Sequence, residues 1–439
     1  MSDRHLLFHC PYLSPRFFPI IVFLFSIAHE LLEKSVVVNS LAFTSVQTRE
    51  LFPVTTPFKT GTIQEHNLYY EMYGNEKGVP ALFLHGGPGA GCFPRHACFF
   101  NPEFYCIVLL DQRGCGRSKP LLLTEHETKR LVEDCEVLRS ELGFDKWGVV
   151  MGGSWGSFLA IRYAQEFPSK VRSIILRGVC LMRAPEVEWL FGEDGVAMLQ
   201  PEAWNEFAQM VFDSDSHRHN RSVLYEYCNW LIHGSPEHRI AAAQKWFRWE
   251  MTIGKYNGLK EGESTDDAVF IWNKNKWSIK NYSNSTDNDL LAKVGSYLQP
   301  KLKDNNLIRN VPEYVPAYPR KDAPSINMQA LSARNMTKED YLSYVPAQNI
   351  LTCWYSVKNG FDSDIILSEQ KMRRIRHIPC IAIHGGRDFI TPIDNALDLA
   401  DAWPGLELNI PLASKHSMYE PRTISELIIA TEKLKDYLT

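Results

Sequence analysis

The 439-residue chain lacks the features that would tie it to nucleic acid, to a metal or to a disulfide framework. Its formal net charge of −4 offers no basic surface for nucleic acid or for an acidic membrane. Its ten cysteines include no C-x-x-C pair and no spacing typical of a metal site, so we predict free thiols and no metal. Scattered thiols in so long a chain favour a reducing, cytoplasmic compartment.

Long apolar runs are also missing, apart from one near the start of the chain. Residues 17–28 (FFPIIVFLFSIA) are too few to span a bilayer comfortably, but they have the length of the apolar region of a signal peptide. We therefore predict that residues 1–48 are a leader. It is either a targeting segment for a secretory or organellar compartment or an apolar element of the folded domain, and no stable membrane partner is expected.

The chain does contain enough apolar material for a large core. Hydrophobic residues make up 45% of it, which is typical of a globular protein. From about residue 49, short apolar runs alternate with amphipathic stretches, which predicts an α/β fold with a mostly parallel sheet and helices on both faces. The predicted strands are 63–73, 81–84, 105–110, 147–151, 171–176, 378–383 and 406–410, and the predicted helices are 124–142, 157–165 and 424–437.

The alternation of strands and helices stops near residue 183 and resumes near residue 376. This interruption predicts a core whose first part is residues 49–182 and whose second part is residues 376–439, with an inserted, mainly helical cap domain at 183–375. Within the cap, residues 259–335 are rich in asparagine and carry several prolines. We expect them to form a surface insertion that buries little apolar area.

A G-x-S-x-G pattern at residues 152–156 is the strongest chemical indication in the chain. It stands between a predicted strand and a predicted helix. A serine on such a tight turn is held with its hydroxyl exposed, and glycines flank it because side chains there would collide. Ser154 is therefore predicted to be a nucleophile.

A serine nucleophile needs an imidazole to take its proton and a carboxylate to fix the tautomer of that imidazole. In an α/β-hydrolase sheet the acid and then the histidine follow the serine, each after a late strand. Asp388 follows the strand at 378–383 and His416 follows the strand at 406–410. We predict an α/β-hydrolase core with the triad Ser154, His416 and Asp388. Serine chemistry of this kind needs no cofactor, and we predict none.

Two other aspartates near strand ends are set aside. Asp394 follows Asp388 closely and is expected to lie in the next helix. Asp111 ends a strand but precedes the serine, which is the wrong order, so we expect a buried carboxylate that braces the turn at 112–114.

The oxyanion of the reaction needs N–H donors that are already in place. We expect one from the backbone of Trp155, the residue after the nucleophile. We expect the other from Gly87 in the segment His-Gly-Gly-Pro-Gly at 85–89, where glycines leave the backbone open to a substrate. A plain tight turn is the alternative reading of that segment.

Taken together, the motifs are more specific than any one alone. They are HGGPG at 85–89, DQRGCGRS at 111–118, GGSWGS at 152–157, LRG at 176–178, a WE pair at 249–250, GGRD at 385–388 and KHS around His416. In this combination the chain resembles the proline iminopeptidase (prolyl aminopeptidase) family over residues 49–250 and 345–437. The resemblance implies an α/β-hydrolase that removes N-terminal proline from peptides with the triad given above.

The resemblance also implies residues that bind the substrate. The family holds the free amino terminus with two glutamates, and buried carboxylates are the physical solution for an ammonium. One matches Glu250 of the WE pair, whereas Thr352 stands where the second is expected, with Glu339 or Asp340 as open alternatives. The arginine of LRG, Arg177, is retained as a further substrate-binding residue.

Two positions depart from the aromatic residues that the family places around its substrate pocket, namely Cys180 and Leu190. A pocket that loses aromatic walls and a carboxylate would bind proline weakly or bind another group. The leading prediction remains a serine aminopeptidase that acts on peptides with a free N-terminus. The alternatives are an esterase or amidase with the same triad and a non-catalytic binding module, and the oligomeric state stays open.

Overall fold

A computed structural model describes residues 43–45, 48–63, 67–212, 222–255, 268–274, 276–281, 347–361 and 363–439. The apolar run at 17–28 and both Glu339 and Asp340 lie outside these residues. None of the helices in the described part combines the length and the apolarity that crossing a bilayer takes. The same residues hold no group of three or more His, Cys, Asp and Glu side chains placed to bind a metal, and their nine cysteines are free and buried.

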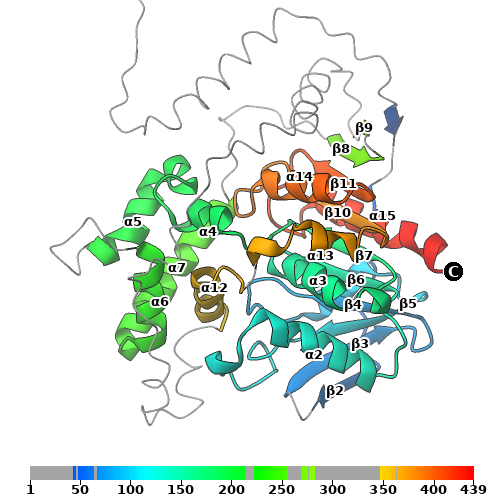
Figure 1. The fold of residues 1–439 in the computed structure, drawn as a ribbon, viewed down its shortest axis with the longest axis horizontal. Helices are drawn as coiled ribbons and strands as arrows, with labels where there is room; N and C mark the ends of the chain where they lie inside the picture. The colour runs from blue at the N-terminus through cyan, green and yellow to red at the C-terminus, as the bar shows by residue number, and fades with distance from the viewer. Residues whose placement is uncertain are drawn as a thin grey trace, which may run out of the picture.

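The core is a large sheet that is parallel at its centre (Figure 1). Within the described residues it has 11 strands in the order β1-β9-β8-β11-β10-β7-β6-β4-β5-β3-β2. Its parallel strands are β5 (Tyr105–Leu110), β4 (Val79–Leu84), β6 (Val149–Gly153), β7 (Ile174–Arg177), β10 (Cys380–Ile383) and β11 (Leu406–Pro411). The predicted α/β fold with a mostly parallel sheet is confirmed.

Helices cover both faces of this central block, and the strands are apolar at nearly every position for that reason. Along β4, Leu82 and Leu84 pack with α2 (Thr128–Glu141) and α3 (Trp155–Glu166), while Ala81 and Phe83 pack on the face that α15 (Pro421–Leu438) covers. The remaining described helices of the core are α13 (Glu369–Arg373) and α14 (Ile393–Ala402), with short 3-10 turns η1 (Pro94–Phe99), η2 (Leu123–Glu125), η3 (Pro168–Lys170) and η5 (Ser363–Ile365).

One edge of the sheet is a hairpin where a single strand was predicted. Instead of one strand over 63–73, the chain forms β2 (Lys59–Ile63) and β3 (Leu68–Gly74), paired antiparallel. Asn67 closes the turn with φ of 53°, a backbone conformation that asparagine tolerates better than most residues. The predicted strand therefore begins at Leu68 rather than at residue 63, and Ile63 belongs to the strand before it.

The other edge corrects the prediction of a surface insertion at 259–335. There, β8 (Ala268–Asn273) pairs antiparallel with β11, and β9 (Lys276–Asn281) pairs antiparallel with β8. Val269 and Phe270 are fully buried. Residues 268–274 and 276–281, the described part of that segment, thus extend the core sheet, and β1 (Phe43–Ser45), from the predicted leader, adds a parallel strand beside β9.

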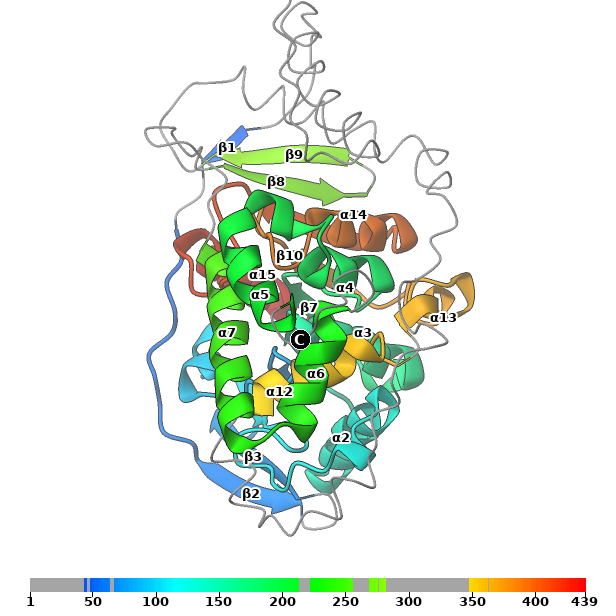
Figure 2. The same ribbon diagram turned by 90° about the vertical axis from the view of Figure 1, so that its left-hand side faces the viewer.

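A group of helices covers the carboxyl ends of the parallel strands. Figure 2 is viewed from the side of this group, so its helices lie in front of the sheet. They are α4 (Ala184–Phe191), α5 (Pro201–Phe212), α6 (Val223–His233), α7 (Pro236–Lys255) and α12 (Ala347–Val357), with the 3-10 turn η4 (Val196–Leu199). Aromatic rings hold this cap together: the Phe207 ring stacks on Tyr227 with 4.3 Å between centroids and on Trp249 with 5.5 Å. These aromatic rings therefore form the core of the cap.

Candidate active site

Ser154 sits at the junction of β6 and α3, on the strand-to-helix turn that the sequence predicts. Its backbone has φ of 56° and ψ of −127°, a strained conformation for a residue with a side chain. A Cβ atom at Gly152 would lie 2.0 Å from the carbonyl oxygen of Gly156, and one at Gly156 would lie 2.1 Å from that of Leu84. Gly152 is therefore required for the turn itself, and Gly156 for the close approach of α3 to β4.

The structure brings the three predicted triad residues together at the carboxyl ends of β6, β10 and β11. The Ser154 hydroxyl lies 3.0 Å from Nε2 of His416. Nδ1 of the same imidazole lies 2.7 Å from Oδ2 of Asp388. With Nδ1 donating to the carboxylate, Nε2 faces the serine as a proton acceptor, which is the arrangement that serine catalysis needs.

The Asp388 carboxylate is buried and fully hydrogen-bonded. Its Oδ1 accepts the backbone N–H groups of Ile390 at 3.0 Å and of Thr391 at 2.9 Å, and its Oδ2 accepts the Thr391 hydroxyl at 2.8 Å. Burial alone would raise the pKa of Asp388, but the charge and the hydrogen bond of His416 outweigh it and hold this pKa well below its usual range. The carboxylate is therefore ionised.

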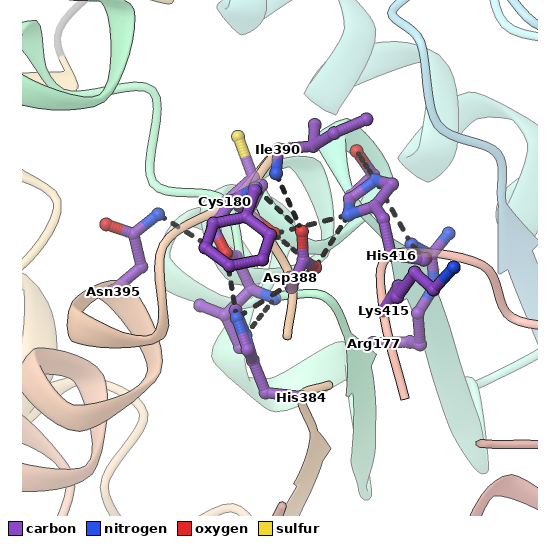
Figure 3. Close-up of polar contacts among 12 residues, drawn as sticks. Arg177, Cys180, His384, Asp388, Ile390, Asn395, Lys415 and His416 are labelled. Carbon is purple, nitrogen blue, oxygen red and sulfur yellow. Dashed lines mark hydrogen bonds and ion pairs between the residues drawn. The ribbon is translucent and has the colours of Figure 1, made fainter. Parts of the chain in front are cut away.

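Two residues that support the carboxylate were not singled out in the sequence. One is Thr391, although a threonine three residues after an aspartate in a turn is a usable indicator. The other is His384, whose Nδ1 accepts the N–H of Val179 at 3.0 Å while Nε2 donates to the Thr391 carbonyl at 2.9 Å. Burial lowers the pKa of His384, so it stays neutral. Figure 3 shows Asp388 between the His384 and His416 rings.

Arg177 is held against the catalytic imidazole. Its Nη1 donates to the backbone carbonyl of His416 at 2.7 Å and lies 3.3 Å from Nε2 of the same residue (Figure 3). Arg177 also lines the cavity next to Ser154. These contacts give it a positioning role for the loop that carries His416, and its predicted contact with substrate stays a prediction.

The backbone groups predicted to bind the oxyanion flank Ser154. Trp155 is the first residue of α3, so its N–H has no acceptor within the helix. On the other side, a Cβ atom at Gly86 would lie 3.2 Å from Cβ of Ser154, which shows how closely this segment approaches the serine. Gly87 follows with φ of 113° and lines the same cavity. The geometry suits an oxyanion between the two segments.

Asp111 is a buried structural carboxylate, as predicted, but its partners differ from those expected. Its Oδ1 accepts the N–H of Cys92 at 2.7 Å, and its Oδ2 accepts Nε of Arg117 at 2.7 Å. It thus ties the chain just after the 85–89 segment to the loop at 117 rather than bracing the turn at 112–114. Asp394, also set aside, lies in the first turn of α14.

A cavity of about 540 Å³ opens over the triad, between the core and the cap. Its walls include Leu190 but not Cys180, which is buried and bonded through its backbone to Ser157. Aromatic side chains nevertheless line it, namely Phe83, Phe93, Phe191, Phe247, Trp249 and Tyr419. The positions of Cys180 and Leu190 supply no ring, as predicted, but other elements of the cap and the core do.

Glu250 supplies the one carboxylate among the described residues that line this cavity. It projects from α7, and its Oε1 accepts the indole N–H of Trp246 at 2.9 Å. Burial raises the pKa of Glu250 to about 7. Thr352 lies on α12 and does not line the cavity; its hydroxyl is 3.5 Å from the carbonyl oxygen of Pro88. The residue that stands in place of a second glutamate therefore contacts the 85–89 segment.

This sheet and this site define an α/β-hydrolase with a serine, histidine and aspartate triad. The family model described as alpha/beta hydrolase fold matches residues 80–218. A proline iminopeptidase from Arabidopsis thaliana is 33% identical over 398 residues, which cover 90% of this chain and 84% of that protein. A proline iminopeptidase from Neisseria meningitidis serogroup B is 32% identical over 392 residues, which cover 88% of this chain and all of that protein.

The chain belongs to the proline iminopeptidase family. Its likeness to solved structures is weaker. The crystal structure of proline iminopeptidase from Mycobacterium smegmatis matches with a TM-score of 0.44 at 15% identity, over 87% of this chain and 98% of that one.

Proposed function

We propose that the protein is a serine aminopeptidase that releases N-terminal residues, preferentially proline, from peptides with a free amino terminus. The observation that carries this proposal is the Glu250 carboxylate in the same cavity as Ser154 and His416. An anion at that place pairs with the ammonium of a peptide. Since the amine is then fixed at one end of the cavity, only the first peptide bond reaches the serine.

The walls beside Glu250 suit a compact apolar side chain. Leu190, Phe191 and Trp249 line this part of the cavity, and the Trp249 indole donates to the Leu190 carbonyl at 3.0 Å. Because the indole N–H and that carbonyl satisfy each other, they offer a bound side chain apolar surface rather than unpaired polar groups. A pyrrolidine ring with a secondary ammonium matches such a site.

The triad geometry supports an acyl-enzyme reaction. Ser154 attacks the carbonyl of the first residue as Nε2 of His416 takes the hydroxyl proton, and the Asp388 carboxylate stabilises the resulting imidazolium. The N–H groups of Trp155 and Gly87 donate to the oxyanion. His416 then donates its proton to the leaving nitrogen, and water hydrolyses the acyl-enzyme by the same steps in reverse.

Glu250→Gln tests the proposed function most directly. Loss of a charge-assisted hydrogen bond is worth about 1.5–3 kcal/mol, so KM for a prolyl amide is expected to rise by about 10-fold to 100-fold. Hydrolysis of a short acyl ester, which has no amine to anchor, is expected to stay unchanged. The measurement is a steady-state profile of prolyl, alanyl and leucyl amides beside that ester. Glu237→Gln, at the exposed start of the same helix, is the matched control and should change neither substrate class.

The opposite outcome would favour the alternative reading of the site. If the wild-type protein hydrolyses short acyl esters while every aminoacyl amide stays inert, the protein is an esterase with this triad and not an aminopeptidase. A wild-type protein that acts on neither class would have to be treated as a binding module.

The raised pKa of Glu250 predicts a pH dependence that is specific to amine substrates. Because the carboxyl is ionised only above a pKa of about 7, kcat/KM for prolyl amides is expected to rise as pH increases through 7 and to fall about tenfold per unit below it. The short acyl ester reports on the triad alone. The ratio of kcat/KM for the amide to kcat/KM for the ester should therefore rise with pH around pH 7. In Glu250→Gln this ratio should no longer depend on pH in that range.

A further inference from the structure

The reaction described above uses only one part of the cavity. Glu250, Leu190 and Trp249 lie at the cap end, while the walls also include residues of η1 and of the segment that follows His416. This second part contains the rings of Phe93, His96 and Tyr419, which we call the aromatic shelf. Nothing in the binding of the amine or in the proton transfers calls for these three rings.

Phe93 presents an exposed ring to the cavity. Its side chain is 59% exposed, although it lines the cavity over the triad and the second half of η1, from His96 on, is buried. Its position is fixed locally, since its N–H donates to Nδ1 of His96 at 3.0 Å and the two rings lie 5.7 Å apart. A fixed, exposed aromatic ring in an active-site cavity is suited to a ligand rather than to the folding of the chain.

The rest of the shelf consists of packed rings. The His96 ring stacks on Phe83 with 4.5 Å between centroids and lies 6.3 Å from Tyr419, nearly parallel to it. The Arg95 guanidinium covers the Tyr419 ring at 4.4 Å. Since Nδ1 of His96 accepts a hydrogen bond and burial lowers its pKa to about 4, the imidazole is neutral at physiological pH. The shelf therefore presents aromatic surface without a net charge of its own.

The chemistry of the triad decides which part of a peptide reaches this shelf. His416 must donate its proton to the leaving nitrogen, so the leaving segment lies on the His416 side of the scissile bond. Ser417, Met418 and Tyr419 follow His416 in the chain and line the cavity there. With the amine held by Glu250 at the cap end, the residue after the cleaved bond points toward Tyr419 and Phe93.

We propose that Phe93, His96 and Tyr419 bind the side chain of the residue that follows the released one, so that the preferred substrates are peptides with an aromatic residue in the second position. This inference rests on the proposed aminopeptidase function and extends it by naming the substrate class. An aromatic side chain there would cover the exposed face of Phe93 and pack edge-to-face or offset-stacked within the shelf.

The test compares two prolyl dipeptide amides, Pro-Phe-NH2 and Pro-Gly-NH2, with free proline measured by chromatography. Wild-type kcat/KM is expected to be at least about 10-fold higher for the phenylalanine substrate, since burial and ring packing of one side chain are together of that order. Phe93→Ala should reduce this preference to about twofold or less, and Phe93→Tyr should retain it. Phe247→Ala removes a ring that is similarly exposed, at 60%, but lies on α7 near Glu250, so it should leave the ratio unchanged.

The outcomes separate this inference from the function on which it rests. Equal rates on the two amides in the wild type, or a preference that survives Phe93→Ala, would overturn the shelf while leaving the aminopeptidase in place. Hydrolysis of neither amide would contradict the proposed function itself, and the shelf with it. A preference lost equally in Phe93→Ala and Phe247→Ala would also overturn the assignment, because the effect would then not belong to the shelf.

Discussion

Replacing Ser154 with alanine is expected to lower kcat on prolyl amides by about 10⁵-fold to 10⁶-fold, the loss typical of removing a triad nucleophile. The hydroxyl is the group that lies 3.0 Å from Nε2 of His416, and the strained turn aims it into the cavity. Release of proline measures the loss. Labelling with a fluorophosphonate probe gives a second readout, since wild-type protein should be labelled at Ser154 and the variant should not.

A neighbouring hydroxyl supplies the matched control. Ser157 lies one turn further along α3, where its hydroxyl donates to the Ser154 carbonyl at 2.7 Å and accepts the N–H of Cys180 at 2.9 Å. Because both bonds are structural, Ser157→Ala should lower the Tm while turnover and labelling persist. Retained labelling in Ser154→Ala would contradict the nucleophile assignment, and an unlabelled wild type would favour the non-catalytic alternative.

The sequence predicts well those parts of the fold that are determined by residues close together in the chain. The run at 105–110 is apolar throughout because helices cover both faces of β5, and the glycines around Ser154 are needed within a few residues of it. The triad partners could be placed as well, since chain order and strand ends locate Asp388 and His416 without any contact being known. Such features need only short windows of sequence.

The features that were missed depend on contacts between distant segments. The apolar run of β8 stands inside a polar, asparagine-rich stretch, and its partner β11 lies far along the chain, so the composition of the stretch concealed a strand. The same holds for the site. His384 is held by hydrogen bonds to Val179 and Thr391. Phe93 can be recognised as a candidate binding residue only because it lines the cavity between the core and the cap. No local pattern distinguishes such residues from ordinary core or surface positions.

Asp388→Asn is expected to lower kcat by about 10⁴-fold with little change in KM, as expected when the base is held in the wrong tautomer. The reason lies in the surroundings of the carboxylate. Its Oδ1 accepts two backbone N–H groups, from Ile390 and Thr391, so an amide at this position must place its oxygen there and its NH2 group toward His416. That NH2 group can only donate to Nδ1, which puts the imidazole proton on Nε2 and leaves Ser154 without an acceptor.

Thr391→Val is the control variant, because it removes a contact of Asp388 without changing the charge of the carboxylate or the tautomer of His416. It removes one hydrogen bond to Oδ2 of Asp388 but keeps the carboxylate and both backbone donors, so kcat is expected to fall by about tenfold or less. Asp388→Asn and Thr391→Val should lower kcat, whereas Glu250→Gln should raise KM, so the two kinetic constants distinguish the variants. If kcat of Asp388→Asn stayed within tenfold of the wild type, another carboxylate would have to orient His416. Asp394, in the first turn of α14, would then be the next residue to replace, because the chain offers it closest to Asp388 in sequence.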